Sequence, residues 1–380
     1  MGDEMEIKDI FPSRIKQARV SREMSAGDLA DRLELSRQVI SQYELGKTTP
    51  SMAVLNSLSH VLKYPVSFFS KEPVSESTAN SPVFFRSRKT TLQKTYNASI
   101  ERIKLLGEIE AYLSRSVDLP KVNLPKIDCE STSLDIDSTE HLSLEVRRYW
   151  GLGVGPIINL LGTLERNGVS VSSITLRLSK IDGFSLWNNG RPTIVISNDR
   201  KSNTRIRFAA SHELLHLILH SDMFTREDLK NKETASMLEK EADIFAGAFL
   251  MPKESFSKDV YSSSIDHFIQ LKAKWKAPIY AMIKRCEILG LLSERQIRYL
   301  SDQMTNRGYW KNEPLDNMPI EKPVAFKQAV ELVIDNKIID AYKFREDTGI
   351  NYDELEEYCF LDKGYLLPPI TNDNIIKLRR

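Results

Sequence analysis

The stretch Ser211-His212-Glu213-Leu214-Leu215-His216-Leu217-Ile218-Leu219-His220 is an H-E-x-x-H pattern set inside an apolar run that predicts a helix. On a helix, residues four apart share a face, so the rings of His212 and His216 can bind one Zn²⁺. Glu213 lies about 100° round the axis. From there its carboxylate could take a proton from water and pass it to a leaving amine. The pattern therefore predicts a zinc-dependent site on one helix.

A zinc site needs a third protein ligand. His220 is eight residues from His212, about 12 Å along a straight helix, which is too far for a shared metal. We expect His220 to pack or to make a helix-end contact. A second apolar helix supplies better candidates in Leu238-Glu239-Lys240-Glu241-Ala242-Asp243-Ile244-Phe245-Ala246. Glu239 can be the third ligand, while Asp243, four residues on, can accept the free ring N–H of His212. Glu241 points about 200° away from Glu239 and is the weaker candidate for the metal.

These two segments together resemble the ImmA/IrrE family of zinc metallopeptidases, whose motif is H-E-x-x-H followed by E-x-x-A-[N/D]-x-F-A and an ending near Leu-Met-Pro. The resemblance covers about residues 159–292. It implies a Zn²⁺ site on the three ligands named above and, from family members that are site-specific proteases, cleavage of a repressor. Two positions depart from the family pattern: Leu215 stands where Gly is usual, and Pro278 stands where Ser is usual. We expect Leu215 to narrow access to the metal.

The sequence leaves the chemistry of this site open at one point. No donor for a developing oxyanion can be assigned, and Tyr280 and Arg207 are both candidates. A zinc site that is structural or regulatory, without turnover, is the competing interpretation.

The residues before the H-E-x-x-H helix favour a small sheet. β-branched segments occur at 169–171, 174–176 and 193–197, and 184–187 leads through Asn188-Asn189-Gly190 into the last of these as a hairpin. The fold class expected is mostly α with a small β-sheet (α+β), made of an N-terminal all-α bundle, a zincin-like domain and a C-terminal helical region.

A different pattern opens the chain. Between 11 and 69, apolar residues recur at helical spacing, with Ser25 and Ser36 placed as N-caps. The stretches Ser25-Ala26-Gly27-Asp28-Leu29-Ala30 and Leu35-Ser36-Arg37-Gln38-Val39-Ile40-Ser41-Gln42-Tyr43-Glu44-Leu45-Gly46-Lys47 resemble the helix-turn-helix of the XRE (lambda repressor-like) family. The resemblance implies a third helix in the major groove of double-stranded DNA. The side chains expected to read bases are Arg37, Gln38 and Gln42, and those expected to contact phosphates are Ser36, Ser41 and Lys47.

The charge balance of this region weakens the prediction of DNA binding by a monomer. Residues 1–70 carry nine Lys/Arg and nine Asp/Glu, and a neutral domain binds phosphate weakly as a monomer. We therefore expect a homodimer, in which a second half-site supplies affinity. A bundle that makes only protein contacts is the alternative.

The expected domains are a helix-turn-helix domain over 1–72, a linker and connecting helix over 73–137, a metallopeptidase domain over 138–300 and a C-terminal helical domain over 301–380. The connecting helix is basic in its first half, which either extends the DNA footprint or is a solvated face. The C-terminal region has no catalytic spacing. It fits contacts within the chain, dimerisation or sensing of a partner.

Composition sets outer limits on the function. With 41% hydrophobic and 28% charged residues among 380, fibrous and wholly disordered classes are excluded, and the net charge of +1 indicates no partner. Three distant cysteines fit a reducing compartment. An acidic N-terminus and the lack of a spanning apolar run predict no membrane insertion, so we expect a cytoplasmic protein.

Taken together, these features predict a DNA-binding transcriptional regulator with a zinc metalloendopeptidase domain, which cleaves a repressor-like protein or itself. The alternative is a non-catalytic repressor or antitoxin-like regulator whose peptidase fold only senses a ligand or partner. Replacement of Glu213 by Gln would distinguish the two.

Overall fold

The computed structural model describes residues 10–73, 91–128, 131, 133–174, 182–197, 202–225 and 227–367. The chain forms two compact units. The first falls within Met1–Ser75, Gln93–Asp118 and Phe326–Arg380, and the second within Glu76–Leu92 and Leu119–Ala325. Helices predominate in the described residues, with one small sheet, which confirms the α+β class. Most of the expected linker lies outside the described residues.

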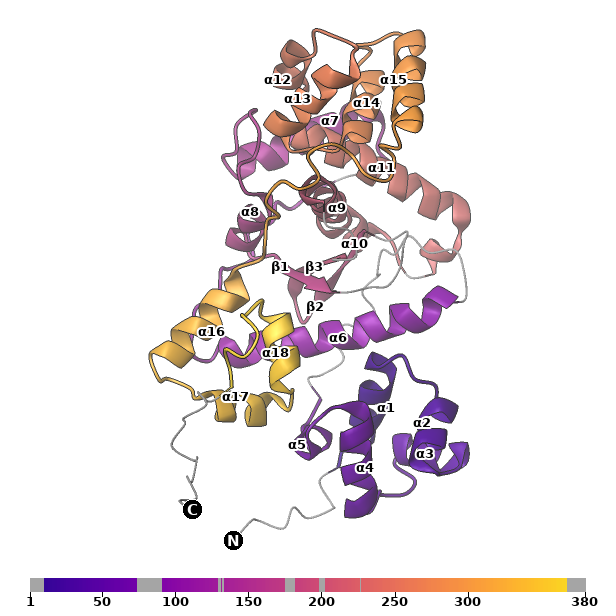
Figure 1. Cartoon of the computed structure of the whole chain (residues 1–380), viewed down its shortest axis with the longest axis vertical. Helices are drawn as coiled ribbons and strands as arrows, with labels where there is room; N and C mark the ends of the chain where they lie inside the picture. The colour runs from indigo at the N-terminus through magenta and orange to yellow at the C-terminus, as the bar shows by residue number, and fades with distance from the viewer. Residues whose placement is uncertain are drawn as a thin grey trace, which may run out of the picture. The chain divides into compact units, whose positions relative to one another are not determined.

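The first unit begins with a bundle of short helices (Figure 1). They are α1 (Pro12–Ser21), α2 (Ala26–Leu33), α3 (Arg37–Glu44), α4 (Met52–Leu62) and α5 (Val66–Phe69). Ser25 and Asp28 form a capping box at the start of α2, and the Ser36 hydroxyl accepts a hydrogen bond from the Val39 amide at the start of α3. Ile15, Leu29, Ile40, Leu55 and Leu58 are fully buried. Helical spacing of apolar residues thus gives the bundle its core.

Two later segments of the chain complete the first unit. One holds α6 (Thr91–Leu113), and the other holds α16 (Ala325–Asp335), α17 (Ala341–Thr348) and α18 (Tyr352–Tyr358). Arg22, the C-cap residue of α1, forms a bidentate ion pair with Glu354, in which Nη1 and Nη2 lie 2.6 and 2.7 Å from the two carboxylate oxygens. The Tyr112 hydroxyl of α6 donates to Asp347 at 2.8 Å. The C-terminal region therefore makes contacts within the chain, one of the three roles expected for it.

The second unit contains a three-stranded sheet of order β1-β3-β2. β1 (Ser170–Ile174) pairs in parallel with β3 (Arg191–Ser197), and β2 (Gly183–Asn188) pairs antiparallel with β3. Asn189 and Gly190 join β2 to β3 with φ of 50° and 77°, as a two-residue hairpin turn requires. The expected Asn-Gly hairpin is confirmed, whereas the continuation of the first strand to 175–176 lies outside the described residues.

The rest of the second unit is mainly helical. In chain order they are α7 (Ile136–Tyr149), α8 (Leu160–Arg166), α9 (Asn203–Leu215), the π-helical turn η2 (His216–His220), α10 (Ser221–Met223), η3 (Asp228–Lys230), α11 (Lys232–Leu250), α12 (Lys253–Asp259), α13 (Ile265–Trp275), α14 (Ile279–Ile288) and α15 (Glu294–Asn306). Sheet residues such as Ile194 share one apolar core with Leu214 of α9 and Phe245 of α11. This core holds α9 and α11 side by side.

Buried ion pairs anchor the segment that follows α15. The ammonium group of Lys272 is inaccessible and lies 2.8 Å from Glu313 and 2.7 Å from Asp316. Glu321 pairs with Arg207 of α9 and accepts from the amide of Leu160. The segment is therefore tied to α9 and α13 by ion pairs whose cationic side chains, Arg207 and Lys272, are inaccessible.

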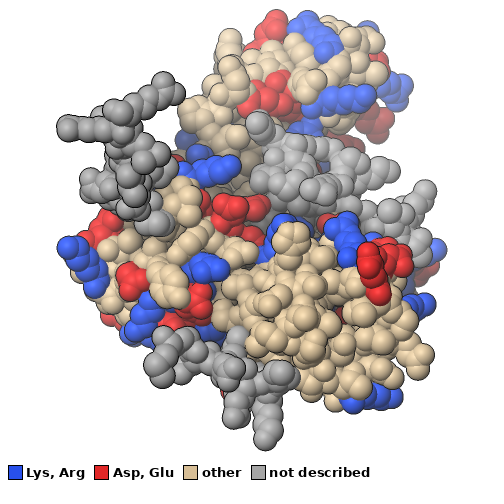
Figure 2. Space-filling model, turned by 60° about the horizontal axis from the view of Figure 1, so that its bottom comes forward, with Lys and Arg blue, Asp and Glu red and all other residues tan. Residues whose placement is uncertain are grey.

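Two surface properties bear on partners. Acidic and basic side chains are intermixed on the face shown in Figure 2, in keeping with the net charge of +1. Within the residues that the structure describes, no helix combines the length and the apolar character that crossing a bilayer requires.

Candidate metal centre

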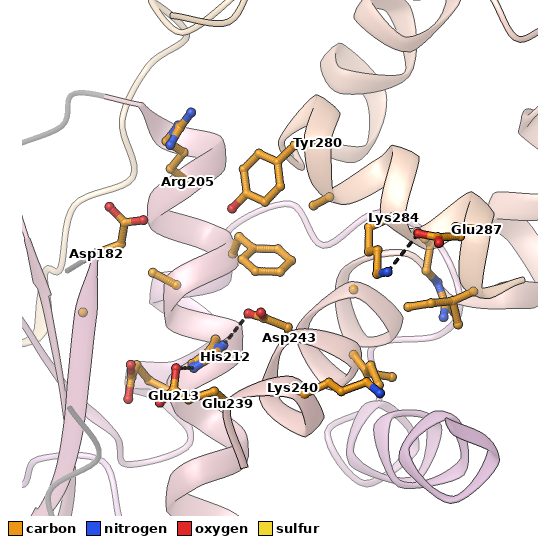
Figure 3. A pocket seen from close by; sticks show the side chains of 18 of the residues that line it. Asp182, Arg205, His212, Glu213, Glu239, Lys240, Asp243, Tyr280, Lys284 and Glu287 are labelled. Atoms are coloured by element: carbon orange, nitrogen blue, oxygen red, sulfur yellow. Dashed lines mark hydrogen bonds and ion pairs between the residues drawn. The ribbon is translucent and has the colours of Figure 1, made fainter. Parts of the chain in front are cut away.

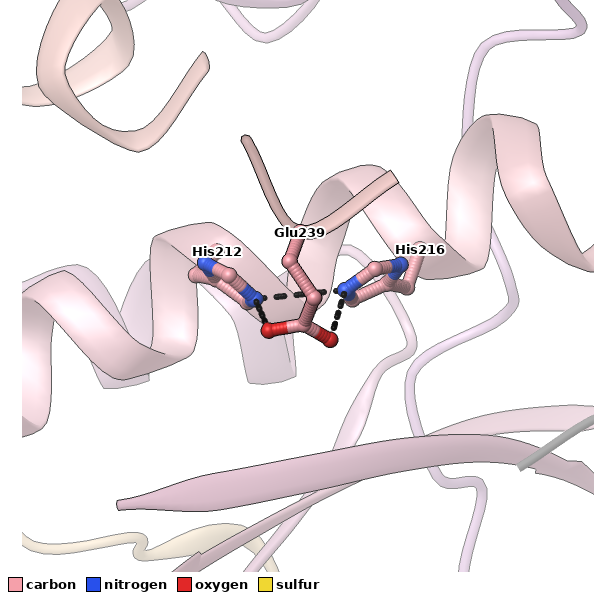
Figure 4. Close-up of side chains that lie close together, drawn as sticks. All are labelled: His212, His216 and Glu239. Carbon is pink, nitrogen blue, oxygen red and sulfur yellow. Dashed lines mark hydrogen bonds and ion pairs between the residues drawn. The ribbon is translucent and has the colours of Figure 1, made fainter. Parts of the chain in front are cut away.

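Three side chains converge where η2 begins: His212 and His216 from the motif helix, and Glu239 from α11 (Figure 4). The two Nε2 atoms are 3.2 Å apart. Glu239 places Oε2 3.5 Å from His212 Nε2 and Oε1 3.8 Å from His216 Nε2. Bonds of about 2.0–2.1 Å in a tetrahedral zinc site put ligands about 3.3 Å apart. The residues therefore fit a zinc ion.

Asp243 holds the first of these ligands. Its Oδ1 lies 2.9 Å from His212 Nδ1, so Nε2 is the ring nitrogen that faces the cluster. Burial opposes charge on this ring, but hydrogen bonds to Asp243 and Glu239 outweigh it and raise the pKa of His212 to about 10. The surroundings of His212 thus favour a positive charge, which a divalent cation would supply.

Glu213 lies beside the cluster. The Ser185 hydroxyl on β2 donates to its Oε2 at 2.7 Å. Burial raises the pKa of Glu213 to about 7, close to the value that suits proton transfer at neutral pH. A Cβ at Gly183 would be in ordinary contact with Glu213 Cγ at 3.6 Å but would lie 3.0 Å from the Val195 carbonyl oxygen, so glycine eases the close approach of β2 to β3 here.

Ser185 is not among the site residues predicted from the sequence. A signal was available, because Ser185 is a polar residue flanked by Phe184 and Leu186 in a strand that is buried along almost its whole length. A buried hydroxyl needs a hydrogen-bond partner. Only the pairing of β2 beside α9 makes Glu213 that partner.

His220 and Glu241 lie together behind the cluster. His220 is fully buried, and its Nδ1 is 2.8 Å from His216 Nδ1, so it contacts a metal-cluster residue rather than joining the cluster. Its Nε2 is 3.2 Å from Glu241 Oε2. Glu241 therefore faces His220, not the metal position. His220, which was expected to pack or to make a helix-end contact, is packed in the interior and also contacts His216 and Glu241.

The cluster opens into a cavity of about 720 Å³ (Figure 3). Its walls include His212, Glu213, Glu239 and Tyr280. Burial raises the pKa of Tyr280, so its hydroxyl keeps its proton and can donate. The cavity is large enough for several residues of a peptide.

Two expectations about this cavity are wrong. Leu215 does not narrow it, because this side chain is fully buried in the core and is not among the cavity's lining residues. Arg207 does not face it either. Its guanidinium is buried and donates to the carbonyl oxygens of Lys276 and Ile157 and to Glu321. Of the two candidate oxyanion donors, only Tyr280 lines the cavity.

Pro278, the other departure from the family pattern, is the N-cap residue of α14. Proline has no side-chain oxygen with which to cap the helix. Glu313 from the anchored segment takes that place, since its Oε2 accepts from the Ile279 amide at 2.9 Å. The missing serine is therefore replaced by a carboxylate from 35 residues downstream.

In the first unit, α3 presents a separate polar face. A shallow groove on it is lined by Arg37, Gln38, Ser41, Gln42, Leu45 and Lys47. Ser36, which is exposed, caps the helix. Arg14, Arg19 and Arg22, by contrast, form ion pairs inside the unit.

Comparison with known proteins gives separate matches for the region of the metal centre and for the N-terminal helical bundle. Residues 164–287 match the peptidase M78 family model, described as the IrrE N-terminal-like domain, and residues 15–69 match a helix-turn-helix family model. A curated relative is the SPbeta prophage-derived uncharacterized HTH-type transcriptional regulator YonR of Bacillus subtilis (strain 168). It is 36% identical over 62 residues, which are 16% of this chain and 57% of that protein, so the match spans little more than half of the relative.

Proposed function

We propose that this chain, which combines a helix-turn-helix domain with an IrrE N-terminal-like domain, is a DNA-binding regulator and a zinc metalloendopeptidase. The observation that carries the peptidase half is the convergence of His212, His216 and Glu239 within 4.8 Å of one another. Glu213 and a peptide-sized cavity lie beside them. The proposed substrate is a peptide bond in a repressor-like protein or in this chain itself.

A zinc ion on the three ligands would polarise the scissile carbonyl and lower the pKa of a water molecule. The chain's own residues do the rest. Glu213 accepts a proton from the attacking water as the C–O bond forms. It then delivers this proton to the nitrogen of the leaving amine, and the C–N bond breaks. Ser185 holds one carboxylate oxygen of Glu213 and leaves the other for the water. The Tyr280 hydroxyl donates to the substrate from the cavity wall.

The DNA-binding half rests on the exposed face of α3. Arg37, Gln38 and Gln42 offer the paired donors and acceptors that read base edges, and Ser36, Ser41 and Lys47 suit phosphate contacts. We expect two copies to bind an operator with two half-sites. Replacing Gln42 by Ala would reduce discrimination between operators, whereas Lys47→Ala would weaken binding to all sequences alike, as fluorescence anisotropy would show.

Metal content is the first test. Protein purified without a metal-affinity column should carry about one zinc per chain by elemental mass spectrometry. Glu239→Ala should lose it, while Glu233→Ala, an exposed carboxylate at the start of the same helix, should keep it. If the unmodified chain holds no metal, the peptidase proposal fails.

Turnover is tested by Glu213→Gln, which keeps the size and shape of the side chain but removes the base. The variant should retain zinc and bind DNA, yet leave the repressor-like protein and this chain uncleaved. If cells with Glu213→Gln switch the target promoter normally, catalysis is not the function. The domain would then act as a sensor of a ligand or partner.

A further inference from the structure

A line of buried polar groups leads away from the candidate metal position. It starts at His216 Nδ1, which points away from His212 and Glu239 (Figure 4). It continues to His220 Nδ1 at 2.8 Å and from His220 Nε2 to Glu241 Oε2 at 3.2 Å. The Leu134 amide, just before α7, donates to Glu241 Oε1 at 3.0 Å. None of the three side chains is more than 5% exposed.

Hydrogen-bond chemistry leaves one assignment of protons along this line when a cation is bound. His216 Nε2 faces the cation and must carry no proton, so Nδ1 carries it and donates. His220 Nδ1 must then accept, which places the proton of that ring on Nε2. Glu241 accepts a hydrogen bond from His220 Nε2–H at Oε2 and a second one from the Leu134 amide at Oε1. Every donor in the line meets an acceptor.

From this geometry we propose that His220 and Glu241 are positioning residues for the metal centre, which hold His216 in the tautomer and orientation that bind the cation. The proposal deepens the proposed function and rests on it. The two histidine ligands are then supported differently. His212 contacts the carboxylate of Asp243 directly, whereas the neutral ring of His220 lies between His216 and the carboxylate of Glu241.

The π-helical turn explains how the chain achieves this contact. His216–His220 forms a single π-helical turn inside the motif helix, and its two terminal rings pack 4.9 Å apart between centroids. Such turns are rare, occur mostly as single turns inside α-helices and are frequent at functional sites. A purely apolar role for His220 would be met as well by phenylalanine, which needs no partner such as Glu241.

The test exploits two amides that imitate different ring nitrogens. In His220→Asn the side-chain oxygen takes the place of Nδ1 and can still accept from His216. In His220→Gln the amide reaches the place of Nε2 and can contact only Glu241. His220→Phe removes both contacts and keeps the volume. His141→Asn, at an exposed histidine on α7, is the matched control.

Zinc affinity is measured on metal-free protein by competition with a chromophoric chelator, and Co²⁺ is added to record its visible absorption bands. We expect His220→Phe and His220→Gln to bind zinc about 10- to 100-fold more weakly and to shift the Co²⁺ bands. His220→Asn should recover most of the affinity, and the control should match the unmodified chain. Circular dichroism checks that each variant is folded.

The outcomes separate this inference from the function it rests on. A folded His220→Phe variant with unchanged zinc affinity and Co²⁺ spectrum overturns the positioning role. Equal loss in the Asn and Gln variants also overturns it, because affinity would then not follow the Nδ1 contact. If the unmodified chain binds no metal, both proposals fail. If it binds zinc with the expected order of variants but cleaves nothing, the positioning role stands and the peptidase function fails.

Discussion

At the scale of single residues, the two described cysteines show how burial controls reactivity. Cys286 is inaccessible in the core of the second unit, and burial raises its pKa to about 12. Burial raises the pKa of Cys359 in the first unit as well. The thiolate is the reactive form of cysteine. Burial therefore protects both side chains from reaction in two ways, because it blocks access by reagents and keeps the thiol protonated.

A thiol-reactive disulfide reagent should therefore label neither residue in the native protein at pH 8. With Cys129 replaced by Ser, labelling should be at least about 100-fold slower in buffer than after unfolding in guanidinium, since it must wait for local opening. Mass spectrometry of the labelled peptides identifies the site. Rapid labelling of Cys286 in buffer would show that the core of the second unit is looser than described.

At the scale of elements, polar side chains at helix ends form many of the stabilising hydrogen bonds. Asp28 closes the capping box of α2, and its hydrogen bonds with Ser25, together with the Lys94 ammonium group, lower the pKa of its carboxyl to about 2. A lowered pKa means that the ionised carboxylate is the stabilising form. Its contribution is complete above the ordinary value near 4 and is lost as the pH falls through about 2.

Asp28→Asn should therefore destabilise α2 at pH 6, and the difference from the unmodified chain should shrink between about pH 4 and pH 2. Hydrogen exchange of the α2 amides, corrected for intrinsic rates, measures the difference. Glu34→Gln, at the exposed C-cap of α2, serves as a control without a capping bond. A difference that stays constant with pH would show that the charge of Asp28 does not contribute.

Glu313 is the second case, because one side chain serves two elements. It caps α14 through Ile279 and pairs with the inaccessible ammonium group of Lys272 on α13. Removal of one partner from a buried pair leaves an uncompensated charge. Asp316 remains beside Lys272 and limits the loss.

Glu313→Ala should lower the free energy of unfolding by about 3 kcal/mol. Urea denaturation followed by tryptophan fluorescence measures it, because Trp275 lies at the end of α13. Glu294→Ala, an exposed carboxylate on α15, should change stability by less than about 0.5 kcal/mol. Equal midpoints for the two variants would contradict the anchoring role of Glu313.

At the scale of the whole molecule, the first unit joins both ends of the chain. Gly349, between α17 and α18, has φ of +68°, and a Cβ there would lie 3.0 Å from the backbone of Phe68 in α5. Asn351 donates to the carbonyl oxygen of Lys63. The helix-turn-helix bundle therefore contacts residues about 280 positions downstream.

Gly349→Val should separate these helices, because it combines backbone strain with a clash against α5. We expect the first unit to lose about 2 kcal/mol of stability. In hydrogen exchange, protection should fall in α4 and α5 as well as in α17 and α18. Glu357→Ala, on the exposed side of α18, is the control. Unchanged protection in α4 and α5 would mean that the C-terminal helices do not support the bundle.

The sequence by itself determined the local features of this protein. Periodicity and caps predict the bundle with Ser25 and Ser36, the Asn189-Gly190 turn and the motif helix, because each depends on residues a few positions apart. The spacing of His212 and His216 likewise follows from helix geometry alone. These signals also led to Glu239 and Asp243 as candidates, since they lie four apart on a second helix.

Only the tertiary structure decided which polar groups meet across long separations. Ser185 beside Glu213, Glu241 behind His220 and Glu313 at the start of α14 each join different elements. The same holds for the direction of Leu215 into the core. Such contacts depend on how strands and helices pack, and burial then forces each polar group to find a partner. The pattern of residues in one segment does not indicate which residue of another segment will be that partner.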